Sequence, residues 1–263
     1  MKKTTLPNFF FEEVTDQKKL TNPLVNDDIK GFKYQVSITP EKIIRFFFLV
    51  TLFFLITALF LIVFKYNRGS DLLVFKIFNK LFDLDREGNI PAFFSSLLLL
   101  TASLLLIFIH KISTHKANYW LFLSLLFLFL SVDESVQIHE ILNRLKLETE
   151  MFKDLKLVYV WIFPYLILIV LLFFFLKRFI FSLPPQTRNL MILSAVIFVG
   201  SAMGVEIVHD FLKVINGGKE NMYLEFLICL EEIGEMTGTI IFIYTLLTYI
   251  AAKKSTIFIG TEN

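Results

Sequence analysis

The sequence predicts an all-α integral membrane protein, a bundle of six transmembrane helices with a short interfacial amphipathic helix in the first loop. The chain is 56% hydrophobic with a mean hydropathy of +0.67, far above a soluble globular protein. Crossing a hydrocarbon core of about 30 Å takes about 20 apolar residues. Six stretches are long enough: residues 43–64, 91–110, 118–142, 157–176, 190–209 and 223–250.

Polar segments flank this membrane domain, which we place at residues 43–252. Residues 1–42 mix polar and aromatic side chains without a long apolar run, so we expect a weakly structured N-terminal tail. The first helix is predicted to begin at Thr39-Pro40-Glu41, because Thr caps helices and Pro fits their first turn. Residues 253–263 form a short C-terminal tail, and 263 residues leave no room for a second folded domain.

The first loop carries the apolar segment DLLVFKIFNKLF (71–82), in which Lys76 and Lys80 share one side. This pattern fits a helix lying in the membrane interface, and a helix packed over the bundle fits equally well. The following segment, DLDREGNI (83–90), resembles the start of an EF-hand loop. Its twelfth position is Phe94 rather than the bidentate Glu of such loops, so we expect a simple turn leading into the second span.

Charge and cysteine content exclude several classes of function. A net charge of +2 gives no indication of nucleic-acid binding. The single cysteine, Cys229, excludes an intramolecular disulfide. Lys and Arg are nearly balanced between the two sides, and the basic N-terminal tail favours cytoplasmic termini in a bacterial inner membrane. The sequence sets no oligomeric state.

Acids and histidines inside apolar segments are the main functional signal. They occur in SVDESVQIHE (131–140), GVEIVHD (204–210) and LEFLICLEEIGE (224–235). An ionised side chain at the bilayer centre costs roughly 2.5–3.5 kcal/mol, so a group of them needs a compensating partner such as a metal ion. With six spans, all three segments fall in the same half of the bilayer.

Helical spacing groups these residues into stripes. Glu206, His209 and Asp210 lie at i, i+3 and i+4, on one face of a helix. Asp133, Gln137 and Glu140 form a second stripe, and Glu231 and Glu235 are one turn apart, whereas Glu134 is expected to point away from His139. Glycines at positions 200, 204, 234 and 238 form two GxxxG steps, which predict a close approach of the last two spans.

Glu206-Ile207-Val208-His209 is a Glu-x-x-His step, which di-iron and di-manganese bundle proteins use together with glutamates from neighbouring helices. Mostly oxygen ligands with some imidazole suit Fe, Mn or Zn, and we expect two ions rather than one. The predicted metal ligands are His139, Glu140, Glu206, His209, Glu231, Glu232 and Glu235. Asp133 and Asp210 are predicted to act as general bases or to orient His139 and His209.

The leading hypothesis is a metal-dependent membrane enzyme acting on a lipid or another apolar substrate, by oxidation or desaturation with iron or by hydrolysis with zinc. Protonated, mutually hydrogen-bonded acids are the alternative, and they would serve a cation or proton transporter or channel. A structural membrane subunit is a third hypothesis. Arg144 and Lys213 are the nearby cations, too few to neutralise the acids.

The runs GNIPAFFSSLLLL, LSVDESVQIHE and LEEIGEMTG are similar to those of a group of uncharacterised bacterial multi-pass membrane proteins. Members of this group share an LSxDE…HE helix and a later LEE…EMxG helix. The resemblance covers residues 83–250 and leaves out the N-terminal tail. The group has no established activity, so the resemblance supports the choice of residues and implies no reaction.

Overall fold

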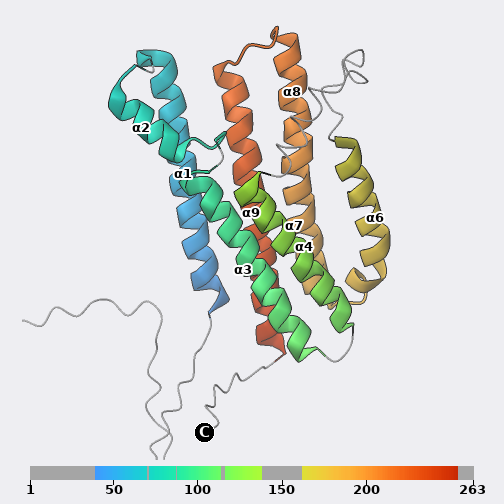
Figure 1. Ribbon diagram of the computed structural model, residues 1–263. Coiled ribbons are helices and arrows are strands. Elements are labelled where there is room, and N and C mark those ends of the chain that lie inside the picture. Colours follow the sequence, from blue (N-terminus) through green and yellow to red (C-terminus); the bar gives the residue numbers. More distant parts are fainter. Residues whose placement is uncertain (1–38, 70, 87, 114–115, 138–161, 254–263) are drawn as a thin grey trace, which may run out of the picture.

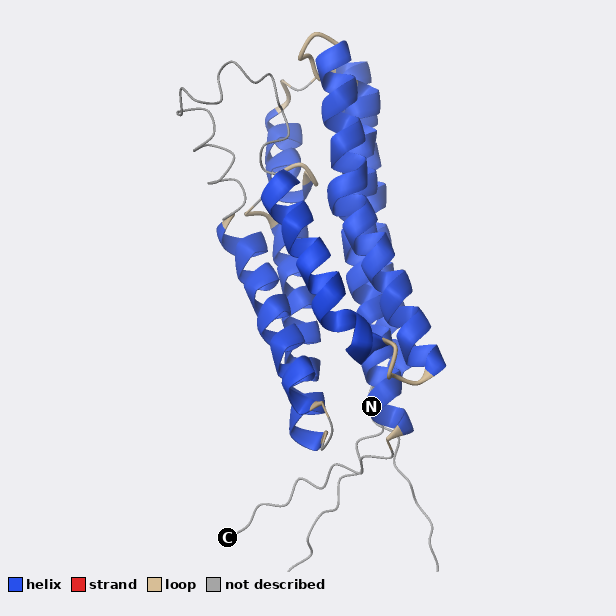
Figure 2. Ribbon diagram, turned by 90° about the vertical axis from the view of Figure 1, so that its right-hand side faces the viewer, coloured by secondary structure: helices blue, strands red, loops and turns tan. Residues whose placement is uncertain are grey.

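The structure, a computed structural model, describes residues 39–69, 71–86, 88–113, 116–137 and 162–253. All regular secondary structure in these ranges is helical (Figure 2), which confirms the predicted all-α class for this part of the chain. Most of the N-terminal tail and of the C-terminal tail lies outside it. The elements are α1 (Pro40–Arg68), α2 (Leu73–Phe82), α3 (Ile90–Ile112), α4 (Ala117–Val136), α6 (Ile162–Ile180), α7 (Pro185–Val199), η2 (Gly200–Val205), α8 (Glu206–Ile215) and α9 (Met222–Ala252).

Four helical segments in the described ranges are long and apolar enough to cross a membrane, as in an integral membrane protein. They are α1, α3, α4 and the run Pro185–Ile215 that joins α7, η2 and α8. Large apolar side chains such as Phe60, Phe93 and Val196 are exposed on their outer faces, where lipid would cover them. These four segments correspond to four of the six predicted spans.

Helix α9 lies at the centre of the bundle and packs against α1, α3, α7, η2 and α8 (Figure 1). Met236, Ile240, Ile243 and Leu246 are completely buried along it, at the i, i+4, i+7 and i+10 spacing of one helix face. The start of α1 and the end of α9 lie at the same end of the bundle (Figures 1 and 2), while α2 and the α8–α9 turn lie at the other.

Helices α3 and α4 are joined by two reciprocal pairs of buried serines. The Ser103 hydroxyl donates to the Ser124 carbonyl at 2.9 Å, and the Ser124 hydroxyl donates back to the Ser103 carbonyl at 3.0 Å. Seven residues away on each helix, Ser96 and Ser131 repeat this exchange at 2.8 and 2.9 Å. Such bonds require a close approach of the two backbones, which small residues allow. These serine pairs were not among the features predicted from the sequence.

Ser124→Leu should therefore force α3 and α4 apart and lower the free energy of unfolding by about 1–3 kcal/mol. Ser124→Ala removes one hydroxyl without a clash and should cost only about 0.6 kcal/mol. Thermal unfolding in detergent measures both. The matched control is Thr101→Leu, because the Thr101 hydroxyl bonds the Leu97 carbonyl of its own helix. An equal loss in Ser124→Leu and Thr101→Leu would contradict the role of the serine contact.

The two predicted GxxxG steps behave differently. A Cβ atom at Gly238 would lie 2.8 Å from the backbone nitrogen of Phe198 on α7, and one at Gly234 would overlap the Ser201 side chain. The α9 glycines therefore permit close packing, as predicted. Around Gly200 and Gly204 no described atom lies within 4 Å of the Cβ position, so the prediction that they pack closely is wrong.

Gly238→Ala should lower the unfolding free energy by about 1–3 kcal/mol, because its methyl group meets backbone that cannot move without shifting α7. Gly204→Ala adds the same methyl group to open space and is the matched control. Differential scanning fluorimetry of the purified protein compares the two variants. Because Ala favours a helix over Gly, the control should be at least as stable as the wild type, and a control that unfolds at the same temperature as Gly238→Ala would contradict the role of the α7–α9 contact.

Candidate functional site

Three helices bring carboxylates to one region of the bundle. Asp133 and Glu134 lie in the last turn of α4, Glu206 begins α8, and α9 contributes the remaining acids from its first half. Asp133 is buried and the others are half-buried. We call the following group the carboxylate cluster: Asp133, Glu134, Glu206, Glu231, Glu232 and Glu235.

Electrostatic contacts show that the carboxylate cluster is one unit. Glu235 is under the combined field of Glu134, Glu231, Glu206 and Asp133, so acids from α4, α8 and α9 act on the same carboxyl group. Glu231 in turn is under the field of Glu206, Glu232 and the neighbouring Asp210. The cluster therefore includes Glu134, which was predicted to point away from His139.

Residue His209 lies on the same face of α8 as Glu206 but has its own partners. It is buried, with Nδ1 3.3 Å from Asp210 Oδ1 and Nε2 3.8 Å from Glu220 Oε2. Glu220 also pairs with Lys213. Among the described residues, Nε2 makes no hydrogen bond. The Glu-x-x-His step thus gives Glu206 to the carboxylate cluster, while His209 joins Asp210 and Glu220.

No group of three His, Cys, Asp or Glu side chains in the described ranges has an arrangement that would hold a metal ion. Two predicted ligands, His139 and Glu140, lie outside those ranges, as does Arg144. Helix α4 ends at Val136, and Gln137 has a left-handed backbone with φ of 64°. The predicted helix over 118–142 therefore ends at Val136 within the described residues, and Gln137 leaves the helical stripe that it was predicted to share with Asp133.

A π-helix, η2, directly precedes Glu206. It interrupts what the sequence predicted as one regular span, and its six residues include Gly200 and Gly204. Each π turn holds more residues than an α turn, so η2 rotates the polar face of α8 relative to α7. Such insertions often occur at functional sites, and here the insertion sets the direction of Glu206. In the sequence, the two glycines, which form helices weakly, were the one indication of this irregularity.

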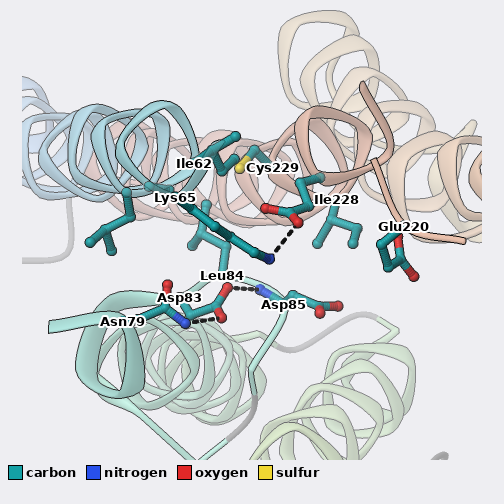
Figure 3. Close-up of a pocket in the computed structure, with 12 residues that line it drawn as sticks. Ile62, Lys65, Asn79, Asp83, Leu84, Asp85, Glu220, Ile228 and Cys229 are labelled. Atoms are coloured by element: carbon teal, nitrogen blue, oxygen red, sulfur yellow. Dashed lines mark hydrogen bonds and ion pairs between the residues drawn. The ribbon is translucent and has the colours of Figure 1, made fainter. Parts of the chain in front are cut away.

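A polar pocket of about 80 Å³ opens beside the carboxylate cluster, between α1, the α2–α3 turn and α9 (Figure 3). Lys65 Nζ bonds Glu225 Oε1 at 2.6 Å, and the Tyr66 hydroxyl donates to the same oxygen at 2.9 Å. The segment that resembled an EF-hand start forms one wall as a turn, as predicted. The residues that line the polar pocket are Ala58, Leu61, Ile62, Lys65, Asn79, Asp83, Leu84, Asp85, Glu220, Glu225, Ile228 and Cys229.

Hydrogen bonds fix the acidic wall of this pocket. The Asn79 amide donates to Asp83 Oδ2 at 2.8 Å, and the Asp85 backbone nitrogen donates to Asp83 Oδ1 at 3.3 Å. Figure 3 shows the Asp85 and Glu220 side chains on the same side of the pocket. Asp85 acts electrostatically on Glu231, so the acids of the pocket influence those of the carboxylate cluster.

The surroundings of Asp85 raise its pKa from 3.8 to about 6. The largest cause is desolvation, because protein atoms crowd the carboxyl group although it still reaches solvent. The negative charges of Asp83 and Glu220 add to this rise in pKa, and Lys213 and His209 oppose it. Asp85 therefore changes its charge in the physiological range.

Stability should depend on pH through this group. An unfolded Asp loses its proton near pH 4 and the folded Asp85 near pH 6, so the folded state binds more protons between these values. The unfolding free energy contributed by Asp85 therefore falls as pH rises through this window. Asp85→Asn should flatten that part of a denaturation profile measured against pH. Asp71→Asn, an exposed carboxyl outside the pocket, should keep the wild-type profile, and an unchanged Asp85→Asn profile would contradict the raised pKa.

Comparisons with known proteins identify a family without a described activity. The family model "Domain of unknown function (DUF8692)" matches residues 47–250, which include the carboxylate cluster and the polar pocket. No curated protein matches the chain. No solved structure matches it either.

Proposed function

The chain belongs to the DUF8692 family, and we propose that it is a six-span membrane enzyme whose carboxylate cluster binds a metal ion together with His139 and Glu140, which lie outside the described residues. The observation that carries the proposal is the combined field of four acids from α4, α8 and α9 on Glu235. We propose a bacterial inner membrane with both termini in the cytoplasm, because the N-terminal tail carries seven lysines.

Repulsion among the carboxylates favours a bound cation. Carboxylates that share a low-dielectric region repel one another, so they bind cations or take up protons. The described members of the cluster offer oxygen ligands alone, and oxygen ligands suit Mn²⁺ better than Zn²⁺. His139 and Glu140 remain proposed ligands from the sequence, and imidazole from His139 would broaden the choice to Fe and Zn.

A lipid or another apolar molecule is the proposed substrate because α8 faces two environments. Val208 and Phe211 are exposed on its apolar side, while Glu206, His209 and Asp210 occupy its polar side. A substrate dissolved in the lipid beside the apolar side of α8 would thus lie only about one helix diameter, roughly 10 Å, from the polar side of the same helix. The carboxylate of Asp210 beside His209 Nδ1 would leave the buried Nε2 to accept a proton, the arrangement of a general base. This pair favours hydrolysis over oxidation.

Metal analysis of the purified protein is the decisive experiment. We expect near-stoichiometric Mn, Fe or Zn in the wild type and at least a tenfold loss of metal affinity in Glu235→Gln, which removes a charge but keeps the shape. Glu41→Gln, an exposed carboxyl in the first turn of α1, is the matched control and should bind metal normally. Wild-type protein that stays free of metal after titration with Mn²⁺, Fe²⁺ and Zn²⁺ would overturn the proposal.

Cation or proton transport is the second candidate, favoured by the electrostatic coupling between acids of the polar pocket and acids of the carboxylate cluster. Asp85 acts on Glu231, and Glu231 acts on Glu235, so a cation would always have a carboxylate within its electrostatic range. Flux across proteoliposomes separates the candidates. A transporter would lose flux in Glu235→Gln and keep it in His209→Ala, whereas an enzyme would lose turnover in both variants and keep metal in His209→Ala.

A further inference from the structure

A second hollow, of about 270 Å³, adjoins the polar pocket and shares Lys65 and Asn79 with it. It is formed where the end of α1, helix α2 and the following turn meet. We call it the basic hollow, because four of its six lining residues are cationic. The six lining residues are Lys65, Phe75, Lys76, Asn79, Lys80 and Arg86.

The charges of the basic hollow are largely available to a ligand. Lys65 is engaged by Glu225 in the neighbouring pocket. Lys76, Lys80 and Arg86 are exposed and form no ion pair within the part of the chain that the structure describes. No acid is among the six lining residues, so Lys76, Lys80 and Arg86 give the hollow a positive charge that favours an anion.

Helix α2 has three distinct faces, at 100° per residue. Phe75 and Phe82 hold it against α1, since Phe75 stacks on Phe64 with ring centroids 5.3 Å apart and Phe82 meets Phe53 edge-on at 5.9 Å. Lys76, Asn79 and Lys80 form a second face along the basic hollow. The third face is apolar and exposed, and consists of Leu73, Val74, Ile77, Phe78 and Leu81.

The arrangement of the three faces of α2 indicates how deep the basic hollow lies relative to the membrane surface. The exposed apolar face of α2 belongs in lipid, and the lysine face next to it then lies at the level of the headgroups. Lys65 gives the same level independently, because it directly follows the apolar run of α1 that ends at Phe64. The cations of the basic hollow therefore gather where phospholipid phosphates lie.

We propose that the basic hollow binds the phosphate headgroup of an anionic phospholipid. The lysines supply point charges, and the Arg86 guanidinium offers paired donors that match a phosphate. The acyl chains would lie against the exposed apolar face of α2, so one lipid would satisfy both neighbouring faces of the helix. Basic hollows at membrane surfaces bind anionic headgroups by this chemistry. The inference goes beyond the proposed function and does not depend on it.

The test uses the full-length protein in a neutral detergent, titrated with phosphatidylglycerol or phosphatidylcholine and analysed by native mass spectrometry. We expect wild-type protein to retain one phosphatidylglycerol at least tenfold more tightly than phosphatidylcholine. The triple variant Lys76→Gln/Lys80→Gln/Arg86→Gln should lose this preference, since each cation contributes several-fold to headgroup affinity. These side chains are exposed, so the helical content measured by circular dichroism should not change.

A matched triple variant carries the same number of lost charges at the opposite end of the bundle. Lys42→Gln/Arg45→Gln/Lys111→Gln removes two lysines and one arginine, all exposed, and should keep the wild-type preference. Equal binding of both lipids by wild type, or an equal loss in both triple variants, would overturn the proposal.

Competition with inorganic phosphate is the third part of the test. Displacement of phosphatidylglycerol by phosphate at equal concentration would identify a free-anion site and overturn the lipid assignment.

Discussion

The close contact between α7 and α9 is the constraint on which the other features depend. At Gly238 the two helices approach so closely that the Phe198 backbone occupies the space of a side chain. This contact holds α9 at the bundle centre and brings the continuation of α7, with Glu206, alongside Glu231 and Glu235. Without it, the acids of these helices would be separated by ordinary side chains and would not share one field.

The α3–α4 serine pairs complete this arrangement from the opposite side. They lock α4 against α3, and α3 packs on α9, so the last turn of α4 delivers Asp133 and Glu134 to the same region. Both devices use small residues in place of large apolar ones. In lipid, burial of apolar surface drives helix association weakly, and close backbone packing with interhelical hydrogen bonds takes its place. The same contacts that stabilise the bundle thus position its carboxylates.

Apolar length predicted the helices well, because a span must satisfy all of its backbone hydrogen bonds internally. Helical spacing also indicated which acids of α8 and α9 would meet. The failures have local causes. Periodicity assumes a regular α-helix, so it missed the π-helix before Glu206 and the left-handed Gln137 that ends α4. Glycine spacing cannot show which face of a helix meets a neighbour, so Gly200 and Gly204 were assigned a contact that only Gly234 and Gly238 make.

The π-helix has a consequence for how this site tolerates change. Converting one π turn to an α turn removes about one residue from the winding and rotates everything after it by about 100°. Glu206, His209 and Asp210 all follow η2, whereas the Phe198 contact precedes it. The direction of the α8 polar face is therefore encoded by the number of residues in Gly200–Val205 more than by their identity. Deleting one residue there would turn the side chains of Glu206, His209 and Asp210 to a new direction while leaving the contact between Phe198 and Gly238 intact.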